Sequence, residues 1–351
     1  VCSQKGLAER FDSSIGGNSV LMPFGGKNQL TPTEGMVAKL PVIGAETTTA
    51  TAMTYGYNPY LMEWSPFHGA MYAVIESVAK MVALGGRADK IRLTFQEYFE
   101  SLGTDSRKWG RPFAALLGAL WAQHQLEIPA IGGKDSMSGT FMDLTVPPTL
   151  TSFAVDVMKA DNALSPEFKV AGSKVYYVPM PKDKLAMPDF RKLRDTYEKV
   201  SNFIAAKKVF AASSVRMGGT AAAITKMCLG NGIGFRFNSK PSMEDLFKAD
   251  YGALILEVAP DSDIKEALAG TGCYELGTTT QNSNIVAGEA VIGFAEAKKA
   301  YTSPLEKIFP TKVKVGEKKT ASEYIYTGGN RVTPKVGIAK PKIFIPVFPG
   351  T

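Results

Sequence analysis

The residues best suited to chemistry lie in the stretch 128–140, where a short apolar run is followed by two glycines and then by polar residues. This pattern predicts a buried strand that runs into a loop. Gly132 and Gly133 permit positive φ and a close approach of the backbone to a ligand. Charge and hydroxyl groups for an anion or a nucleotide phosphate come from the next three residues, Lys134, Asp135 and Ser136. A tight turn with solvated polar side chains explains the same composition equally well. A Walker A loop is excluded, because Ile128 stands where its first glycine belongs and Asp135 where its Ser or Thr belongs.

A second pair of charged residues lies inside a predicted helix from Phe67 to Leu84, which ends at Gly85-Gly86. This helix is apolar nearly all round, which is typical of a buried helix. Glu76 and Lys80 are four residues apart and therefore lie on the same face. They form either a self-neutralising ion pair or half of a ligand site.

Strands and helices of both kinds must position these residues, which predicts a mixed α/β chain. Strands are expected at 36–45, 91–95, 128–131, 150–158, 174–178, 209–212, 233–237, 253–258 and within 284–294. Helices are expected at 67–84, 111–125, 189–207, 220–229 and 261–269. Residues 1–35 are rich in Gly and Ser and predict an extended connector. Pro166 to Gly172 predicts a boundary between two units, and the pattern fades into a linker after about residue 305.

Composition excludes several classes of protein. The 351 residues predict two domains, and the apolar fraction of 45% is ordinary for a globular chain. Much of the net charge of +7 falls late in the chain without interleaved aromatic residues, so a lysine-rich linker explains it and no nucleic-acid partner is expected. Three widely spaced cysteines suggest a reducing compartment and no zinc site, and two histidines exclude a histidine-rich metal centre. No apolar run reaches the roughly 18 residues that cross a bilayer.

The two ends suggest a piece of a longer protein. The chain begins at Val1 with no signal-like segment. Lys342 to Phe348 predicts an apolar strand close to the end of the chain. Because no partner strand follows it, we expect it to be the first strand of a further domain.

Four motifs together resemble phosphoribosylformylglycinamidine synthase in its large single-chain form, and the resemblance covers nearly the whole chain. They are Met22-Pro-Phe-Gly-Gly-Lys-Asn-Gln-Leu-Thr-Pro, Thr54-Tyr-Gly-Tyr-Asn-Pro-Tyr, Trp64-Ser-Pro-Phe-His-Gly-Ala and Gly132-Gly-Lys-Asp-Ser-Met-Ser. The segment 341–351 resembles the opening strand of that family's glutaminase domain, whose catalytic residues would lie beyond Thr351.

The resemblance implies an aminoimidazole ribonucleotide synthetase-like two-domain unit, and this chain resembles the second half of the synthase core. A connector at 1–35 precedes a barrel-forming amino-terminal domain at 36–165 and an α/β carboxy-terminal domain at 166–305. A linker at 306–340 and the truncated glutaminase domain at 341–351 follow.

The family reaction converts formylglycinamide ribonucleotide and glutamine to the amidine with ATP and Mg²⁺, in the cytoplasm, during purine biosynthesis. The implied partners are the first half of the core and the glutaminase domain. No catalytic residue is expected in this chain, which we expect to be inactive alone and to form a homodimer through an exposed edge of the barrel-forming domain.

The magnesium ligands that the resemblance implies are largely altered. Glu76 survives as a vestigial metal ligand, but Lys80 occupies the asparagine position and Ser214 the later aspartate position. The first-strand aspartate falls near Gly44, with Glu46 close by. A protonated ammonium cannot ligate Mg²⁺, so we expect a degenerate nucleotide site. The alternative is an intact ATP-Mg²⁺ half like aminoimidazole ribonucleotide synthetase.

Two cations in Gly-rich loops are the remaining candidates for a bound anion such as sulfate or phosphate. These are Arg216, before Gly218-Gly219, and Lys27, after Gly25-Gly26. A surface lysine beside a turn is the more ordinary interpretation of Lys27.

Overall fold

The computed structural model describes residues 1–10, 17–239, 241–312, 340 and 342–347. Val1–Lys312 form one compact unit, and Val313–Thr351 form a second unit. No helix among the described residues is long and apolar enough to cross a membrane. The account below concerns the first unit unless it says otherwise.

The first sheet has five strands in the order β3-β4-β9-β5-β6. All neighbours are antiparallel except β5 and β6, which are parallel. Alternate residues of β4, β9 and β5 are buried, as expected of a sheet with one covered face. The opposite face is open and presents Tyr55 and Val157, which are 51% and 64% exposed. The bounds are β3 (Met36–Lys39), β4 (Thr49–Gly56), β5 (Arg92–Tyr98), β6 (Ala130–Lys134) and β9 (Thr149–Lys159).

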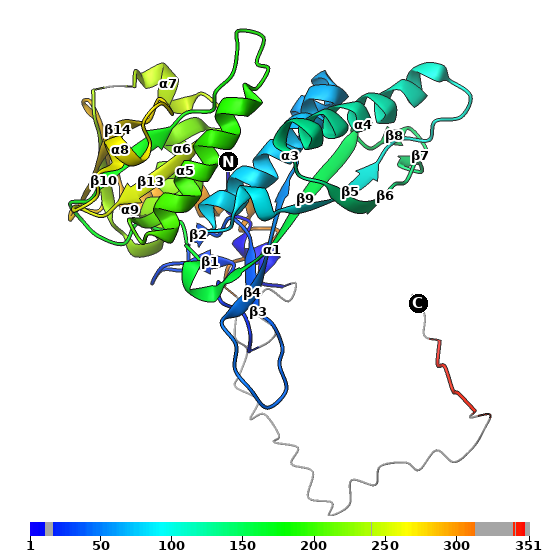
Figure 1. The fold of residues 1–351 in the computed structure, drawn as a ribbon, viewed down its shortest axis with the longest axis horizontal. Coiled ribbons are helices and arrows are strands. Elements are labelled where there is room, and N and C mark those ends of the chain that lie inside the picture. Colours follow the sequence, from blue (N-terminus) through cyan, green and yellow to red (C-terminus); the bar gives the residue numbers. More distant parts are fainter. Residues whose placement is uncertain (11–16, 240, 313–339, 341, 348–351) are drawn as a thin grey trace, which may run out of the picture. The chain divides into compact units, whose positions relative to one another are not determined.

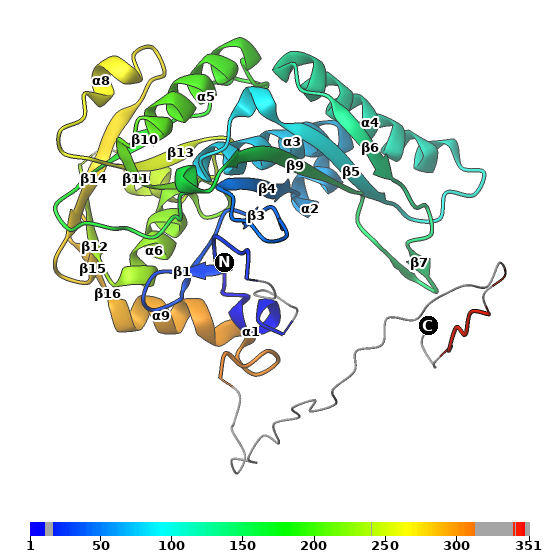
Figure 2. The ribbon, with the colours of Figure 1, turned by 60° about the horizontal axis from the view of Figure 1, so that its bottom comes forward.

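Helix α3 (Pro66–Ala83) packs on the covered face of this sheet, and α4 (Ser106–Leu126) packs along α3, as Figures 1 and 2 show. The Ser65 side chain caps α3 by accepting from the backbone N–H of His68. Residues 69–83 of α3 are all buried, so the helix predicted over 67–84 is confirmed. A short helix, α2 (Pro59–Trp64), precedes α3 and was not predicted.

The second sheet has seven strands in the order β11-β13-β10-β14-β12-β15-β16, antiparallel except for the β12-β15 pair. Its strands are β10 (Lys174–Val178), β11 (Val209–Ser214), β12 (Gly234–Phe237), β13 (Leu254–Val258), β14 (Tyr274–Thr280), β15 (Asn284–Ala287) and β16 (Ala290–Gly293). The associated helices are α5 (Phe190–Ala205), α6 (Gly219–Asn231), α7 (Met243–Phe247), α8 (Ile264–Ala267) and α9 (Phe294–Thr302). Strand β14 and helices α7 and α9 were missed by the sequence analysis.

The two sheets share one hydrophobic core. Residues of α3 contact β11, and the buried apolar cluster continues from one sheet to the other. The Ser201 hydroxyl of α5 donates to the carbonyl of Gly86, 3.2 Å away, just beyond the end of α3. The mixed α/β architecture predicted from the sequence is therefore observed.

The described parts of the segment 1–35, residues 1–10 and 17–35, are packed rather than extended. Strands β1 (Phe24–Gly25) and β2 (Thr31–Pro32) pair as a hairpin, and α1 (Lys5–Ala8) precedes them. The hairpin lies so close to α6 that a Cβ added to Gly26 would overlap the backbone of Gly230. This packing brings Glu34 to the second sheet.

Two further expectations differ from the structure. The strand around Gly132 was expected to be buried, but β6 is an edge strand with one neighbour and its residues 131–134 are exposed. In the second unit, Lys342–Val347 contain neither helix nor strand, so the strand expected at 342–348 is absent from its described part, and Phe348 lies outside the described residues. The remaining elements are η1 (Ala88–Lys90), β7 (Thr140–Phe141), β8 (Leu144–Thr145), η2 (Ala160–Asn162) and η3 (Ser303–Leu305).

Candidate functional site

The buried ion pair between Glu76 and Lys80 lies on α3, beside the end of β4. Lys80 Nζ is 2.7 Å from Glu76 Oε1, and the two side chains are only 2% and 6% exposed. The same ammonium donates to the carbonyl oxygen of Tyr55 at 2.7 Å and lies 4.1 Å from the centre of the Tyr55 ring. A carboxylate, a carbonyl and an aromatic face therefore surround this cation.

Glu34 supplies the second buried carboxylate, and the end of β11 holds it. Oε1 accepts from the Ser213 hydroxyl at 2.8 Å and from the Ser214 backbone N–H at 3.0 Å, and Oε2 accepts from the Ser214 hydroxyl at 2.7 Å. Burial raises the pKa of Glu34, but Arg216, Lys80 and the Ser214 hydrogen bonds outweigh burial and hold the pKa below its ordinary value. Glu34 is therefore ionised.

Two further cations approach this pair of carboxylates without a close partner. Arg216 lies 3.9 Å from Glu34 and 3.9 Å from Glu76, at the limit of an ion pair, and its Nε has no hydrogen-bond partner in the described part of the chain. Lys226 lies on α6 and lines the same cavity. Burial and the neighbouring charges of Arg216 and Lys80 lower the pKa of Lys226, Glu34 and Glu76 oppose them, and the net pKa is about 8.

The cluster of Glu34, Glu76, Lys80, Arg216 and Lys226 thus holds three cations and two carboxylates. It lines a cavity of about 870 Å³ whose wall includes the tyrosines Tyr55, Tyr57, Tyr251 and Tyr301. When all five groups are ionised, one positive charge has no counter-charge within the cluster. Because an uncompensated buried charge is costly, this arrangement favours the binding of an anion.

The same residues do not fit Mg²⁺. Magnesium requires oxygen ligands in a near-octahedral array, and here an ammonium lies directly against Glu76. The described residues contain no group of three or more His, Cys, Asp or Glu side chains arranged to hold a metal ion. Glu76 is therefore paired with Lys80 rather than available as a metal ligand.

The predicted site residues lie in three separate places. Arg216 precedes the first residue of α6, whereas the backbone N–H of Lys27 donates to the Asn231 side chain at the last residue, 3.0 Å away. A helix of 13 residues is roughly 20 Å long, so these two cations do not share a ligand. Lys134, Asp135 and Ser136 lie at the exposed end of β6, where the Lys134 ammonium donates to the Ser136 hydroxyl. Neither Lys27 nor the β6 group lines the cavity.

Sequence reasoning missed Glu34 and Lys226. Gly44 and Glu46 were expected near the metal position, but both are exposed in the loop between β3 and β4. Glu34 was overlooked because it lies in the segment taken as a connector. Lys226 lies two turns after Gly219 and therefore on the same face of α6. Helical spacing shows which residues share a face, but it does not show what that face contacts.

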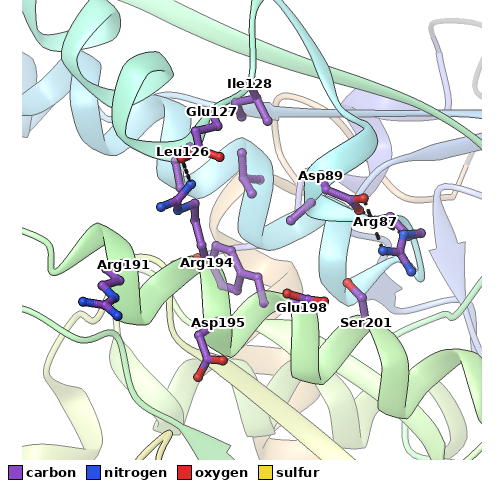
Figure 3. Close-up of a pocket in the computed structure, with 13 residues that line it drawn as sticks. Arg87, Asp89, Leu126, Glu127, Ile128, Arg191, Arg194, Asp195, Glu198 and Ser201 are labelled. Atoms are coloured by element: carbon purple, nitrogen blue, oxygen red, sulfur yellow. Dashed lines mark hydrogen bonds and ion pairs between the residues drawn. The ribbon is translucent and has the colours of Figure 1, made fainter.

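A smaller hollow of about 500 Å³ lies between α5, η1 and the end of α4 (Figure 3). Several of its charges are matched in pairs. Arg194 pairs with Glu127, and Arg87 Nε lies 2.9 Å from Asp89 Oδ1. Because Arg87 and Arg194 already have carboxylate partners and only Arg191 has none among the described residues, this hollow is a weaker candidate for a charged ligand than the cavity around Lys226.

Comparison with solved structures identifies the class of fold. The Thermotoga maritima PurL complexed with FGAR superposes with a TM-score of 0.59 at 14% identity, over 74% of this chain and 48% of that chain. The T. maritima PurL complexed with ADP gives a TM-score of 0.59 at 13% identity, over 79% of this chain and 47% of that one. The chain therefore has the fold of about half of a PurL molecule.

Comparison with curated sequences names the similar protein. The phosphoribosylformylglycinamidine synthase subunit PurL of Picrophilus torridus is 26% identical over 342 residues, which covers 88% of this chain and 43% of the relative. The chain thus spans less than half the length of that relative. No family model matches the chain.

Proposed function

We propose that this chain is the second half of the synthase core of a phosphoribosylformylglycinamidine synthase of the large single-chain form, an ATP-dependent ligase of purine biosynthesis. The support is the PurL fold, the similarity to a curated PurL sequence over most of the chain and the four sequence motifs. The partners in this proposal are the first half of the core and a glutaminase domain. Three free cysteines accord with a cytoplasmic location.

Within that enzyme, this half is a scaffold. At its former metal site, the charge of the remaining carboxylate is neutralised by a lysine of the same chain. The observation that carries this proposal is the ammonium of Lys80, held between Glu76 Oε1 and the Tyr55 carbonyl at 2.7 Å from each. An ammonium in this position supplies the positive charge that Mg²⁺ would otherwise bring. The half therefore needs no metal to remain folded, and its cavity retains a preference for anions.

The exposed edge of the five-stranded sheet, together with the open face beside it, is the surface through which this half meets the first half of the core. Its apolar residues include Met36, Met53 and Val157, which are 45%, 40% and 64% exposed in the described chain. Contiguous exposed apolar surface of this kind marks an interaction site. In the isolated chain, a second copy takes the place of the missing half and forms a homodimer.

Thermal melting with ADP tests the scaffold role. A ligand at about 100 times its dissociation constant stabilises the folded state by roughly 2.7 kcal/mol, so binding is readily detected. We expect the native chain to melt at the same temperature in ADP with Mg²⁺ and in ADP with a chelator. In the variant Lys80→Asn, Ser214→Asp, which restores oxygen ligands, we expect Mg²⁺ to add to the stabilisation.

Magnesium-dependent stabilisation of the native chain would contradict this proposal. That result would mean that the half holds a metal nucleotide, as in the intact alternative. The single variant Ser214→Asp is the matched control. It adds a carboxylate but keeps Lys80, so the melting temperature should remain independent of Mg²⁺.

A further inference from the structure

Helix α4 presents a large apolar face that nothing in the described part of the chain covers. The residues that pack toward α3 are mostly small, and a Cβ added to Gly118 would overlap the carbonyl oxygen of Phe67. The large side chains point the other way and are between 42% and 63% exposed. We call these six residues the α4 face: Trp109, Phe113, Leu116, Leu117, Leu120 and Trp121. Figure 2 shows α4 along the outer side of the helical layer.

The α4 face is unusually large for an exposed apolar surface, and one of its large side chains is held in place by a hydrogen bond. Six large side chains, each about half exposed, leave on the order of 600 Å² of mostly apolar surface uncovered. One side of a standard protein interface buries roughly 800 Å², so this helix and its immediate flanks are nearly sufficient for a stable contact. The Trp109 indole N–H donates to the Gly103 carbonyl at 3.0 Å, which holds this ring in place before any partner arrives.

The sequence of α4 is complementary to itself when reversed about Ala115. Trp109 and Trp121 are equally distant from Ala115 on either side, and so are Phe113 and Leu117. The same reversal places Leu120 opposite Gly110, where an added Cβ would meet no other atom and the surface is therefore recessed. An antiparallel helix pair brings these positions together, with a large side chain over a small one.

The charges of α4 favour the same orientation. The helix contains no Asp or Glu between Ser106 and Leu126. Arg107, Lys108 and Arg111 lie in its first two turns, and Glu100 neutralises part of this charge because it pairs with Lys108 and Arg111. Antiparallel pairing places this basic end beside the carboxyl end of the second helix, whose carbonyl groups carry partial negative charge. Parallel pairing would bring the two basic ends together.

We propose that the α4 face pairs with the α4 face of a second copy of this chain, as two antiparallel helices related by a two-fold axis that crosses the exposed side of α4 at the height of Ala115. This contact is separate from the sheet-to-sheet pairing of the proposed function, because α4 packs on α3, which covers the opposite face of the sheet. In a two-fold contact, both copies use the same surface, so that surface must be complementary to itself. The symmetry of α4 about Ala115 meets this requirement.

Cysteine cross-linking tests this geometry on the whole chain. Chains carrying Gly110→Cys are mixed with chains carrying Leu120→Cys and treated with a bismaleimide that spans an interhelical distance of roughly 8–10 Å. We expect a covalent dimer in the mixture only. Each variant alone should not react with itself, because equivalent residues lie roughly 15 Å apart along antiparallel helices. The native chain, with Cys2 and Cys273 partly exposed, controls for background.

Light scattering provides the second readout. Leu120→Arg should lower the average mass at micromolar concentration to that of the dimer formed by the sheet alone, while its melting curve stays close to that of the native chain because Leu120 is 49% exposed. The control Leu185→Arg removes an apolar side chain that is 77% exposed outside α4, and it should leave the mass unchanged. A mass that ignores Leu120→Arg, or equal cross-linking in single-variant samples, would overturn the proposal. A native dimer that Leu120→Arg converts to monomers would support the α4 contact and contradict the sheet-to-sheet dimer, and a monomeric native chain would contradict both.

Discussion

At the scale of single residues, Lys80 determines what the buried cluster can bind. Its ammonium is 2% exposed and lies against Glu76, so the charge is part of the folded core rather than a mobile surface group. Burial lowers the pKa of Lys80, and Arg216 lowers it further, while Glu76 and Glu34 oppose both effects. The sequence showed the Glu76 and Lys80 spacing but not Glu34, because contact with a residue 46 positions earlier cannot be read from helical periodicity.

Removing the Lys80 charge should strongly destabilise the chain. Lys80→Met leaves Glu76 without its close partner and should lower the free energy of unfolding by about 3–5 kcal/mol. Lys199→Met is the matched control, since Lys199 and Asp195 have the same spacing on α5 but are 34% and 56% exposed. That change should cost no more than about 0.5 kcal/mol. Urea unfolding measures both, and equal losses would show that the buried pair has no special role.

Glu97 should give the chain a pH-dependent stability. Burial raises the pKa of Glu97 to about 7, with a further contribution from Asp135, and its Oε1 has no partner in the described structure. Between the pKa of an unfolded glutamate and about 7, the folded chain binds more protons than the unfolded chain, so stability falls as pH rises through this window.

The variant Glu97→Gln should remove much of that dependence. We expect the loss of stability between about pH 5 and pH 7 to shrink by on the order of 2 kcal/mol. The exposed Glu63→Gln should leave the slope unchanged. An unchanged slope in Glu97→Gln, measured by urea unfolding at several pH values, would assign the dependence to other groups.

At the scale of elements, α3 and α4 show what sequence pattern can predict and what it cannot. The run of apolar residues in α3 and its glycine stop predicted a buried helix, and the structure confirms it. The edge position of β6 was not predictable, because an apolar run before two glycines does not reveal how many neighbours a strand will have. Likewise, the alanine- and leucine-rich pattern of α4 did not reveal which of its faces would be covered.

Substitution of two glycines of α4 by alanine should change the stability of the chain in opposite directions. At an exposed helical position, Gly→Ala gains up to about 1 kcal/mol of helix propensity, and Gly110 has no atom in the way. At Gly118 the added methyl group would overlap the Phe67 carbonyl oxygen, so Gly118→Ala should destabilise the chain despite the same gain. Melting at low protein concentration compares them, and stabilisation by Gly118→Ala would contradict the close packing of α3 and α4.

At the scale of the whole chain, two uncovered surfaces and one cavity define the proposed role. The open sheet face and the α4 face lie on opposite sides of the α3 layer, so each can take its own partner. The mixed α/β fold followed from the alternation of strand and helix patterns. The cluster did not follow, because it combines Glu34 before β3, two residues of α3, the loop before α6 and α6 itself, and only the folded chain brings these segments together.

The most direct measurement of the central claim is calorimetric titration of the native chain with inorganic phosphate in the presence of a chelator. Because Arg216 and Lys226 lack close carboxylate partners, we expect phosphate to bind without metal, and Lys226→Gln to weaken binding by about tenfold or more, which corresponds to roughly 1.4 kcal/mol. Lys27→Gln is the control and should leave the affinity unchanged, since Lys27 lies at the other end of α6. Absence of binding, or binding that appears only when Mg²⁺ is added, would contradict the account.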